Sequence, residues 1–99
     1  MKLSIVTTMY RSAPHLREFV ERIVIAATKI TDDYEIILVN DGSPDDSLAI
    51  ALNLRENNPK IIIIDLSRNF GHHEAIVAGI KFTSGKHVFL MDCDLEEQP

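Results

Sequence analysis

Two carboxylates near the end of the chain are the residues best suited to chemistry. Asp92 and Asp94 flank Cys93 and directly follow the apolar run Val88–Met91. Alternate side chains of a strand share a face, so both carboxylates can approach one point while Cys93 points the other way, as a small core residue. Mg²⁺ or Mn²⁺ prefers such hard oxygen ligands and typically binds one or two carboxylates plus substrate phosphates. The pair is a candidate metal site, with a solvated acidic turn as the alternative.

Polar or turn-forming residues also follow three earlier apolar runs. Open α/β sheets bind ligands at the carboxyl ends of their strands, so a parallel sheet would bring all four groups to one edge. This convergence favours a ligand site over an isolated acidic turn. The three earlier groups are Thr7-Thr8-Met9-Tyr10, Asn40-Asp41-Gly42-Ser43 and Ser67-Arg68-Asn69-Phe70-Gly71.

Several of these side chains have both a binding and a structural interpretation. Asp41 could accept hydrogen bonds from a base or ribose, or cap the next helix, a task that Ser43 can also perform. Arg68 could pair with a phosphate or with a nearby carboxylate. Tyr10 could stack on a base or close the first loop. The sequence leaves these alternatives open. Gly42 is expected to permit a tight turn and close approach of a ligand.

The segment Gly71-His72-His73 is expected to begin the third helix, whose N-terminus favours an anion. Adjacent residues on a helix point apart, and neither histidine has a metal-binding residue four positions on. A metal cluster is therefore disfavoured there, and a substrate-facing role for His72 or His73 is the better hypothesis.

Four strands and three helices must position these residues. Nearly continuous apolar runs rich in Ile and Val are typical of strands covered on both faces, as in parallel sheets. The alternation predicts an α/β fold, βαβαβαβ, with right-handed crossovers and an open, doubly wound, mostly parallel sheet. The predicted strands are Leu3–Thr8, Glu35–Asn40, Ile61–Leu66 and Val88–Met91. The predicted helices run from Ser12 as N-cap with Pro14 in the first turn, from Ser43 or Pro44 to Asn57, and from His72 to Thr83.

Composition limits the function. The chain has 99 residues, which suits one domain, and a net charge of −5 without a Lys/Arg cluster. We therefore expect no nucleic-acid binding, and an anionic ligand would need a cation or backbone N–H groups. A single cysteine, Cys93, excludes an internal disulfide, and the N-terminus lacks a signal peptide. We expect a cytoplasmic location and, because a strand edge is left uncovered, a possible homo-oligomer.

The four strand-end motifs together resemble glycosyltransferase family 2. The closest likeness is to polyprenyl-phosphate glycosyltransferases, such as dolichol-phosphate mannose synthase and bactoprenol glucosyltransferases. The resemblance implies a GT-A fold, whose nucleotide-binding half is Rossmann-like, and transfer of a sugar with inversion from a UDP- or GDP-linked donor. The motifs that carry it are Ser4-Ile5-Val6-Thr7-Thr8-Met9-Tyr10, Asn40-Asp41-Gly42-Ser43, Ser67-Arg68-Asn69-Phe70-Gly71-His72 and Met91-Asp92-Cys93-Asp94-Leu95.

The resemblance also implies roles for individual residues. The nucleotide-binding residues would be Thr8, Tyr10, Asp41, Arg68, Gly71, His72 and Asp92, and the metal ligands Asp92 and Asp94. In this family the catalytic residues and the site for a lipid-phosphate or saccharide acceptor follow the D-x-D motif, so here they would lie beyond Pro99. Leu95–Pro99 also resembles the start of a loop rather than the end of a domain. We therefore expect residues 1–99 to be the N-terminal nucleotide-sugar-binding part of a GT-A domain, truncated after the D-x-D motif. The parent protein would be membrane-associated on the cytoplasmic face.

Two departures from the family pattern concern the choice of base and donor. Arg11-Ser12 replaces the Asn-Glu that usually follows the tyrosine of the first loop, and Asn40 stands where many relatives have a second Asp.

The main alternative function is a non-catalytic nucleotide- or metal-binding module. A receiver-like signalling domain is disfavoured because no acidic pair follows the first strand. A Rossmann dehydrogenase is disfavoured because no glycine follows it.

Overall fold

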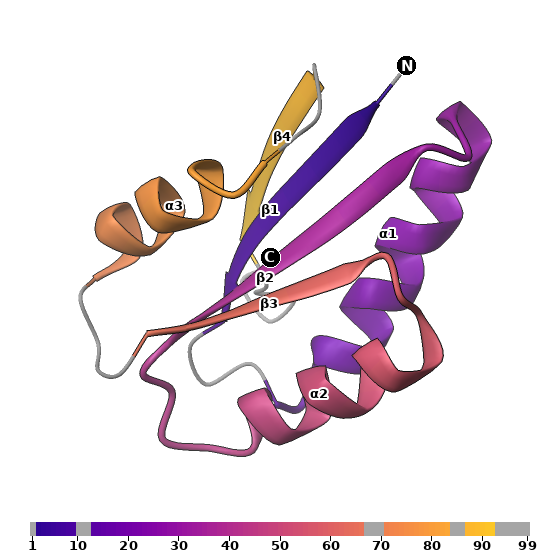
Figure 1. Cartoon of the computed structure of the whole chain (residues 1–99). Coiled ribbons are helices and arrows are strands. Elements are labelled where there is room, and N and C mark those ends of the chain that lie inside the picture. The colour runs from indigo at the N-terminus through magenta and orange to yellow at the C-terminus, as the bar shows by residue number, and fades with distance from the viewer. Residues whose placement is uncertain (1, 10–12, 67–70, 84–86, 93–99) are drawn as a thin grey trace, which may run out of the picture.

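A computed structural model describes residues 2–9, 13–66, 71–83 and 87–92. They form a four-stranded, fully parallel sheet in the order β3-β2-β1-β4, with a helix between each two consecutive strands (Figure 1). The predicted fold class is therefore confirmed. The elements are β1 Leu3–Met9, α1 Leu16–Ile30, β2 Tyr34–Asp41, α2 Ser47–Asn57, β3 Ile61–Leu66, α3 His72–Ile80 and β4 His87–Asp92.

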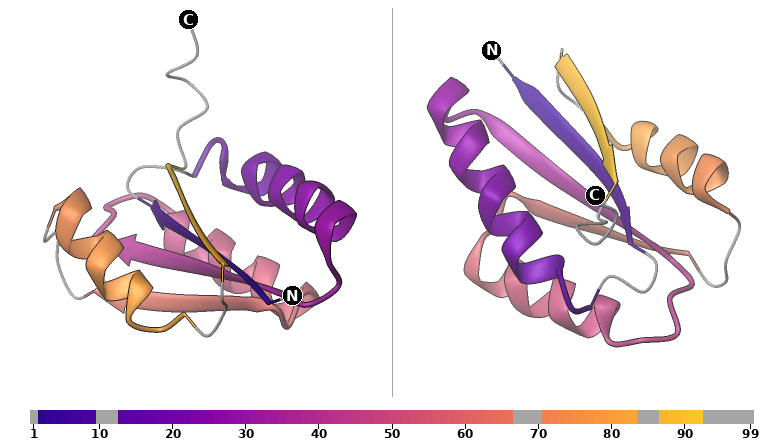
Figure 2. Two further views of the ribbon diagram at one scale, coloured as in Figure 1. Left: turned by 90° about the horizontal axis from the view of Figure 1, so that it is seen from above. Right: turned by 180° about the vertical axis from the view of Figure 1, so that it is seen from behind.

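The helices cover both faces of the sheet, α1 and α2 one face and α3 the other (Figure 2). The alternation of side chains along each strand divides the core accordingly. Leu3 and Ile5 of β1 belong to the cluster under α1, whereas Val6 belongs to the cluster with Ala75 of α3. The predicted apolar stripe of α1 is buried as far as Ala27, but Ile30 is 54% exposed.

Helix α3 lies unusually close to the sheet at Gly79. A Cβ atom at this position would lie 2.5 Å from Cγ1 of Val6 and 3.0 Å from Cγ2 of Val39. Both valines are fully buried, and β-branched side chains have few alternative rotamers. The glycine within the helical pattern is therefore explained by close packing against β1 and β2.

The prediction that α1 begins at Ser12 is wrong, because the helix begins at Leu16. Ser12 lies outside the described residues, and the described part of the segment, residues 13–15, forms a turn that contains Pro14. A residue before proline is disfavoured in helical conformation. The N–H of Ala13 instead donates to the side chain of Asp45 in the next loop, at 3.2 Å.

The predicted start of α2 and end of α3 are also wrong. Helix α2 begins at Ser47 rather than at Ser43 or Pro44, because Asp45 holds the preceding residues in a side-chain-stabilised turn. Helix α3 ends at Ile80 rather than Thr83, where the N–H groups of Phe82 and Thr83 bond three residues back, to Gly79 and Ile80. The side chain of Phe82 is 60% exposed instead of packed.

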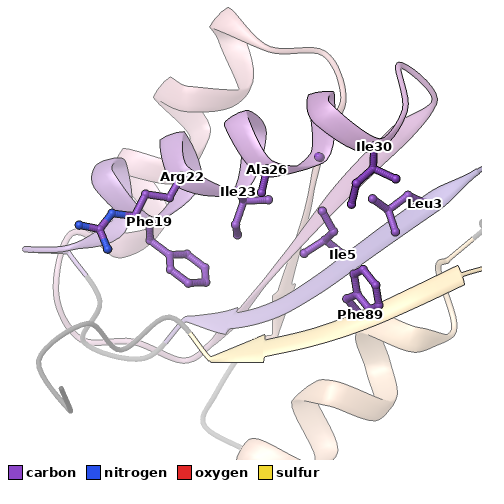
Figure 3. A pocket seen from close by; sticks show the side chains of 9 residues that line it. Leu3, Ile5, Phe19, Arg22, Ile23, Ala26, Ile30 and Phe89 are labelled. Atoms are coloured by element: carbon purple, nitrogen blue, oxygen red, sulfur yellow. The ribbon is translucent and has the colours of Figure 1, made fainter. Parts of the chain in front are cut away.

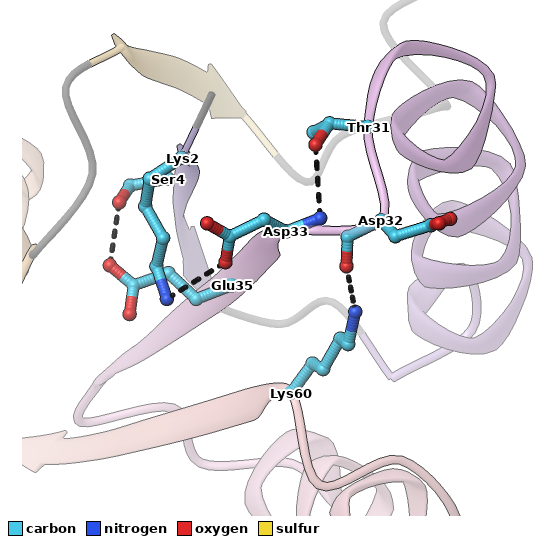
Figure 4. Close-up of polar contacts among 7 residues, drawn as sticks. All are labelled: Lys2, Ser4, Thr31, Asp32, Asp33, Glu35 and Lys60. Carbon is cyan, nitrogen blue, oxygen red and sulfur yellow. Dashed lines mark hydrogen bonds and ion pairs between the residues drawn. The ribbon is translucent and has the colours of Figure 1, made fainter.

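The amino edge of the sheet carries a polar network of its own (Figure 4). The Ser4 hydroxyl donates to the buried carboxylate of Glu35 at 2.5 Å. Lys2 Nζ lies 3.3 Å from Asp33 Oδ1, and Lys60 Nζ donates to the carbonyl of Asp32. The carboxylates of Glu35 and Asp33 are thus engaged in contacts at the amino edge of the sheet, away from the strand ends predicted to bind a ligand.

Strand β4 is the least covered strand. Val88 and Leu90 share one face and Phe89 the other, and all three are exposed, at 37%, 51% and 52%. Among the described residues, β4 therefore leaves apolar side chains uncovered on both faces of the sheet. None of the helices in the described ranges is long and apolar enough to pass through a bilayer.

Candidate functional site

The carboxyl ends of β1 and β4 form the natural ligand position of this sheet. From β1 the chain adds β2 and β3 on one side and then returns to place β4 on the other side of β1. The helix between β3 and β4 consequently covers the opposite face from α1 and α2. Ligands of open α/β sheets bind at such a point, where the strand order reverses.

Register places three of the predicted residues at this edge. Thr8 lies opposite Val39 in β2 and opposite Asp92 in β4. Asp41 follows Val39 by two residues, so Thr8 and Asp41 project on the same face, the one covered by α3. Both side chains are buried, at 8% and 3% exposure, and both are engaged in polar interactions. The expectation that the strand ends converge is thus confirmed for β1, β2 and β4.

The structure describes the other predicted site residues in part or not at all. Asp92 ends β4 and His72 begins α3, and the structure describes the backbone of both but not their side chains. Tyr10, Arg68 and Asp94 lie outside the described residues, as does Cys93. The proposed ligand roles of these residues therefore remain predictions.

Two glycines shape the backbone around the site. Gly42, directly after Asp41, has φ 65°, and Gly71, directly before α3, has φ 98°. These left-handed conformations suit glycine far better than any residue with a side chain. Among the described residues other than its chain neighbours, none would come within 4 Å of a Cβ atom at Gly71, so the positive φ is the reason given by these residues for glycine there. The predicted turn at Gly42 is confirmed.

Asn40 connects two strands at this edge. Its Nδ2 donates to Oδ1 of Asp65 in β3 at 2.9 Å, and its Oδ1 accepts the N–H of Ser43 at 3.3 Å. The side chain is 4% exposed. Because an amide supplies a donor and an acceptor at once, Asn40 satisfies both neighbours. Sequence reasoning placed Asn40 in the second strand-end group and noted it as a departure from the family pattern, but missed this pairing.

Asp45 is a second residue that sequence reasoning missed. The sequence indicated Asp41 or Ser43 for the capping role instead. In the structure, Asp45 Oδ1 accepts the N–H of Ser47 at 3.0 Å, its hydroxyl at 2.6 Å and the Ser43 hydroxyl at 2.5 Å. An aspartate two residues before the first helical residue is a common helix-capping pattern, and this pattern could have identified the role of Asp45 from the sequence.

The hydrogen bonds to Asp45 lower the pKa of its carboxyl group by more than burial raises it. Partial burial by itself would raise the pKa of this carboxyl group. The hydroxyl groups of Ser43 and Ser47 and the N–H groups of Ser47 and Ala13 stabilise the carboxylate and lower its pKa from 3.8 to about 2. Asp45 is therefore ionised at neutral pH.

A separate hollow lies between α1 and the strands β1 and β4 (Figure 3). Its volume is about 420 Å³, and its lining includes Phe19 and Ile30 of α1, Ile5 of β1 and Phe89 of β4. Arg22 is the only charged residue among the described residues that line it. An apolar lining of this kind does not suit a metal-bound diphosphate, so this hollow is not the site predicted at the strand ends.

Comparison with known protein families shows to which family the chain belongs. The sequence profile of the family described as glycosyl transferase family 2 matches residues 4–99. The chain belongs to glycosyl transferase family 2. The resemblance that the strand-end motifs indicated is therefore confirmed.

Relatives of this family 2 chain are considerably longer proteins. A Mycobacterium tuberculosis protein classed among the glycosyltransferases is 54% identical over 99 residues, which is 100% of this chain and 29% of that protein. An undecaprenyl-phosphate 4-deoxy-4-formamido-L-arabinose transferase of Photorhabdus laumondii is 38% identical over 99 residues, 99% of this chain and 30% of that protein. The chain thus spans roughly 30% of the length of the curated relatives it matches.

Solved structures show the fold of this family 2 chain to be GT-A. The mannosyltransferase PcManGT from Pyrobaculum calidifontis, in complex with GDP-Man and Mn²⁺, matches with a TM-score of 0.81 and 18% identity, over 94% of this chain and 27% of that one. TarS of S. aureus, in complex with UDP-GlcNAc, matches with a TM-score of 0.79 and 23% identity, over 95% of this chain and 27% of that one.

Proposed function

We propose that this chain is the donor-binding part of a GT-A glycosyltransferase that transfers a sugar, with inversion, from a UDP- or GDP-linked donor to a polyprenyl phosphate. The observation that carries the proposal is the meeting of β1, β2 and β4 at one edge of the sheet. There Thr8 lies opposite Asp92 in register, and the buried Asp41 ends the neighbouring strand on the same face as Thr8.

Each described residue at this edge has a chemically suitable role. The carboxylate of Asp41, at the buried end of β2, would accept hydrogen bonds from the ribose or base. The hydroxyl of Thr8 would contact the nucleotide from β1. Tyr10 would join Thr8 in the loop that holds the nucleotide. Arg68 and the Gly71-His72 turn, at the N-terminus of α3, would line the donor site and favour its negative charge.

A divalent cation, Mg²⁺ or Mn²⁺, fits the chemistry of the donor set at the end of β4. Asp92 and Asp94 supply the hard oxygen ligands that these ions prefer, and β4 brings Asp92 beside β1 at the point where the strand order reverses. When bound, the cation would neutralise the donor diphosphate and the developing charge on the leaving group. A chain with a net charge of −5 needs such help to bind an anionic donor.

The acceptor assignment rests on relatives. A transferase named for undecaprenyl phosphate is 38% identical to this chain over nearly all of it. A lipid phosphate is already an anionic nucleophile, so it needs no general base to remove a proton. Such an acceptor would place the reaction at the cytoplasmic face of a membrane. The acceptor site would lie in sequence beyond Pro99, and residues 1–99 by themselves would bind donor without completing transfer.

Isothermal titration with UDP-GlcNAc and GDP-mannose, with and without Mn²⁺, tests the donor site. We expect binding of one donor that Mn²⁺ strengthens at least about tenfold, an effect that Asp92→Asn abolishes. Asp46→Asn is the matched control, because it removes an exposed carboxylate in the loop before α2. Binding that is equally strong without metal, and unaffected by Asp92→Asn, would favour a non-catalytic nucleotide-binding module. Sugar transfer by residues 1–99 alone would contradict the assignment of the acceptor site.

A further inference from the structure

The two oxygens of the Asp45 carboxylate serve different segments of the chain. Oδ1 accepts three hydrogen bonds from its own loop, two from Ser47 and one from the Ser43 hydroxyl. Oδ2 accepts the N–H of Ala13, 32 residues earlier in the sequence, at 3.2 Å. The loop between β2 and α2 is thereby joined to the segment between β1 and α1.

The hydrogen bond from Ala13 lies just ahead of the first helical hydrogen bonds of α1. Pro14 has no N–H group, and the helical hydrogen bonds of α1 begin with the N–H of Phe19 bonding to the carbonyl of His15. The other side-chain bond between these two parts, Arg17 Nη1 to Asn53 Oδ1 at 3.1 Å, is exposed and lies farther along the helices. The bond from Ala13 to Asp45, in contrast, joins the two loops themselves.

Both loops lead from strand ends that belong to the donor site. The first follows β1 and Thr8, and the second follows β2 and Asp41. A donor that contacts both strand ends requires them at a fixed separation, and errors of about 1 Å in such positioning are costly. We propose that Asp45 is a positioning residue of the donor site, whose carboxylate fixes the β1–α1 segment against the β2–α2 loop. This inference rests on the proposed function.

The chemistry of the four donors requires a carboxylate at this position. Ser43, Ser47 and Ala13 all donate, and only an ionised carboxylate presents acceptors on both oxygens. In Asp45→Asn, the amide NH₂ replaces one acceptor and faces either the Ala13 N–H or the donors of the second loop. The substitution keeps the volume of the side chain while removing the acceptor for one of the two loops, so that both can no longer be bound at once.

Amide hydrogen exchange tests the connection without any ligand. We expect Asp45→Asn and Asp45→Ala to accelerate exchange in residues 13–16 as well as in residues 43–48, by about tenfold or more. Ser47→Ala is a matched variant because it removes one bond to Asp45 Oδ1 and leaves the Ala13 bond, so it should affect only the second loop. Asp46→Asn should affect neither. Acceleration confined to residues 43–48 in the Asp45 variants would reduce Asp45 to a local cap of α2 and overturn the inference.

Donor titration then tests the positioning role, in conditions where circular dichroism shows every variant fully folded. Asp45→Asn should weaken binding of the preferred donor about tenfold while preserving its dependence on Mn²⁺, because the metal ligands are untouched. Wild-type donor affinity in Asp45→Asn would overturn the positioning role. If the wild-type chain binds neither UDP-GlcNAc nor GDP-mannose, the proposed function fails, while the exchange measurement still decides whether Asp45 joins the two loops.

Discussion

Asn40 and Asp65 join β2 to β3 at the carboxyl edge of the sheet, with 2.9 Å between the amide nitrogen and the carboxylate oxygen. Asn40 is buried and Asp65 is exposed. Asp65 is the register partner of Asn40 in β3, whereas Asp41 follows Asn40 in β2 and projects on the opposite face. An acidic residue at position 40 would have no donor for the carboxylate of Asp65, so position 65 would need a different residue.

Asn40→Asp should lower the free energy of unfolding by about 1–3 kcal/mol at pH 7, because it loses the donor to Asp65 and buries a second carboxylate beside it. The double variant Asn40→Asp/Asp65→Asn restores a donor and an acceptor with their positions exchanged. It should recover most of the loss. Urea unfolding of the wild type, both single variants and the double variant measures the coupling energy. A double variant as unstable as the sum of the single variants would contradict the pairing.

Asp45 should make the stability of the chain depend on pH at the acidic end of the range. Its pKa is lowered from 3.8 to about 2 in the folded state, so the carboxylate stabilises the fold above about pH 4. This contribution, about 1–2 kcal/mol after allowance for partial exposure, is lost as the pH falls from about 4 to 2. The difference in urea unfolding free energy between wild type and Asp45→Asn should shrink over that interval.

The sequence predicted the sheet well because its signals are local. The Ile- and Val-rich runs identified all four strands, and the alternation with helices implied their parallel arrangement. Since the carboxyl ends of parallel strands share an edge, the positions of Thr8, Asp41 and Asp92 followed from topology alone. The strand order that places Thr8 beside Asp92 was not specified by these signals.

The loops were predicted poorly because their structure depends on contacts between distant residues. The start of α1 is set in part by a hydrogen bond from Ala13 to Asp45, 32 residues away. The pairing of Asn40 with Asp65 depends on the register of β2 with β3. Neither contact leaves a periodic pattern in the sequence, so propensity and spacing could not reveal them.

Thr7 offers a stabilising substitution next to the candidate site. Its side chain is fully buried, and its Oγ1 has no hydrogen-bond partner among the described residues. A buried hydroxyl without a partner costs free energy, so Thr7→Val should raise the free energy of unfolding by about 0.5–1.5 kcal/mol. Thr8→Val is the matched comparison, because Thr8 is buried too but is engaged in a polar interaction. Thermal unfolding should show opposite signs for the two variants, and destabilisation by Thr7→Val would reveal an unrecognised partner.

Strand β4 should cause the 99-residue chain to self-associate. Val88, Phe89 and Leu90 expose apolar surface on both faces, and β4 has only β1 as a neighbour among the described strands. Exposed apolar strands at a sheet edge favour pairing with another copy, and a lysine at such an edge opposes it. Sedimentation velocity over a range of concentrations should therefore show dimers or larger species for the wild type and monomers for Leu90→Lys. Ile25→Lys is the control, because Ile25 of α1 is also 51% exposed but lies away from β4, so its variant should associate as the wild type does. A wild-type chain that stays monomeric throughout would show that the β4 edge does not drive association.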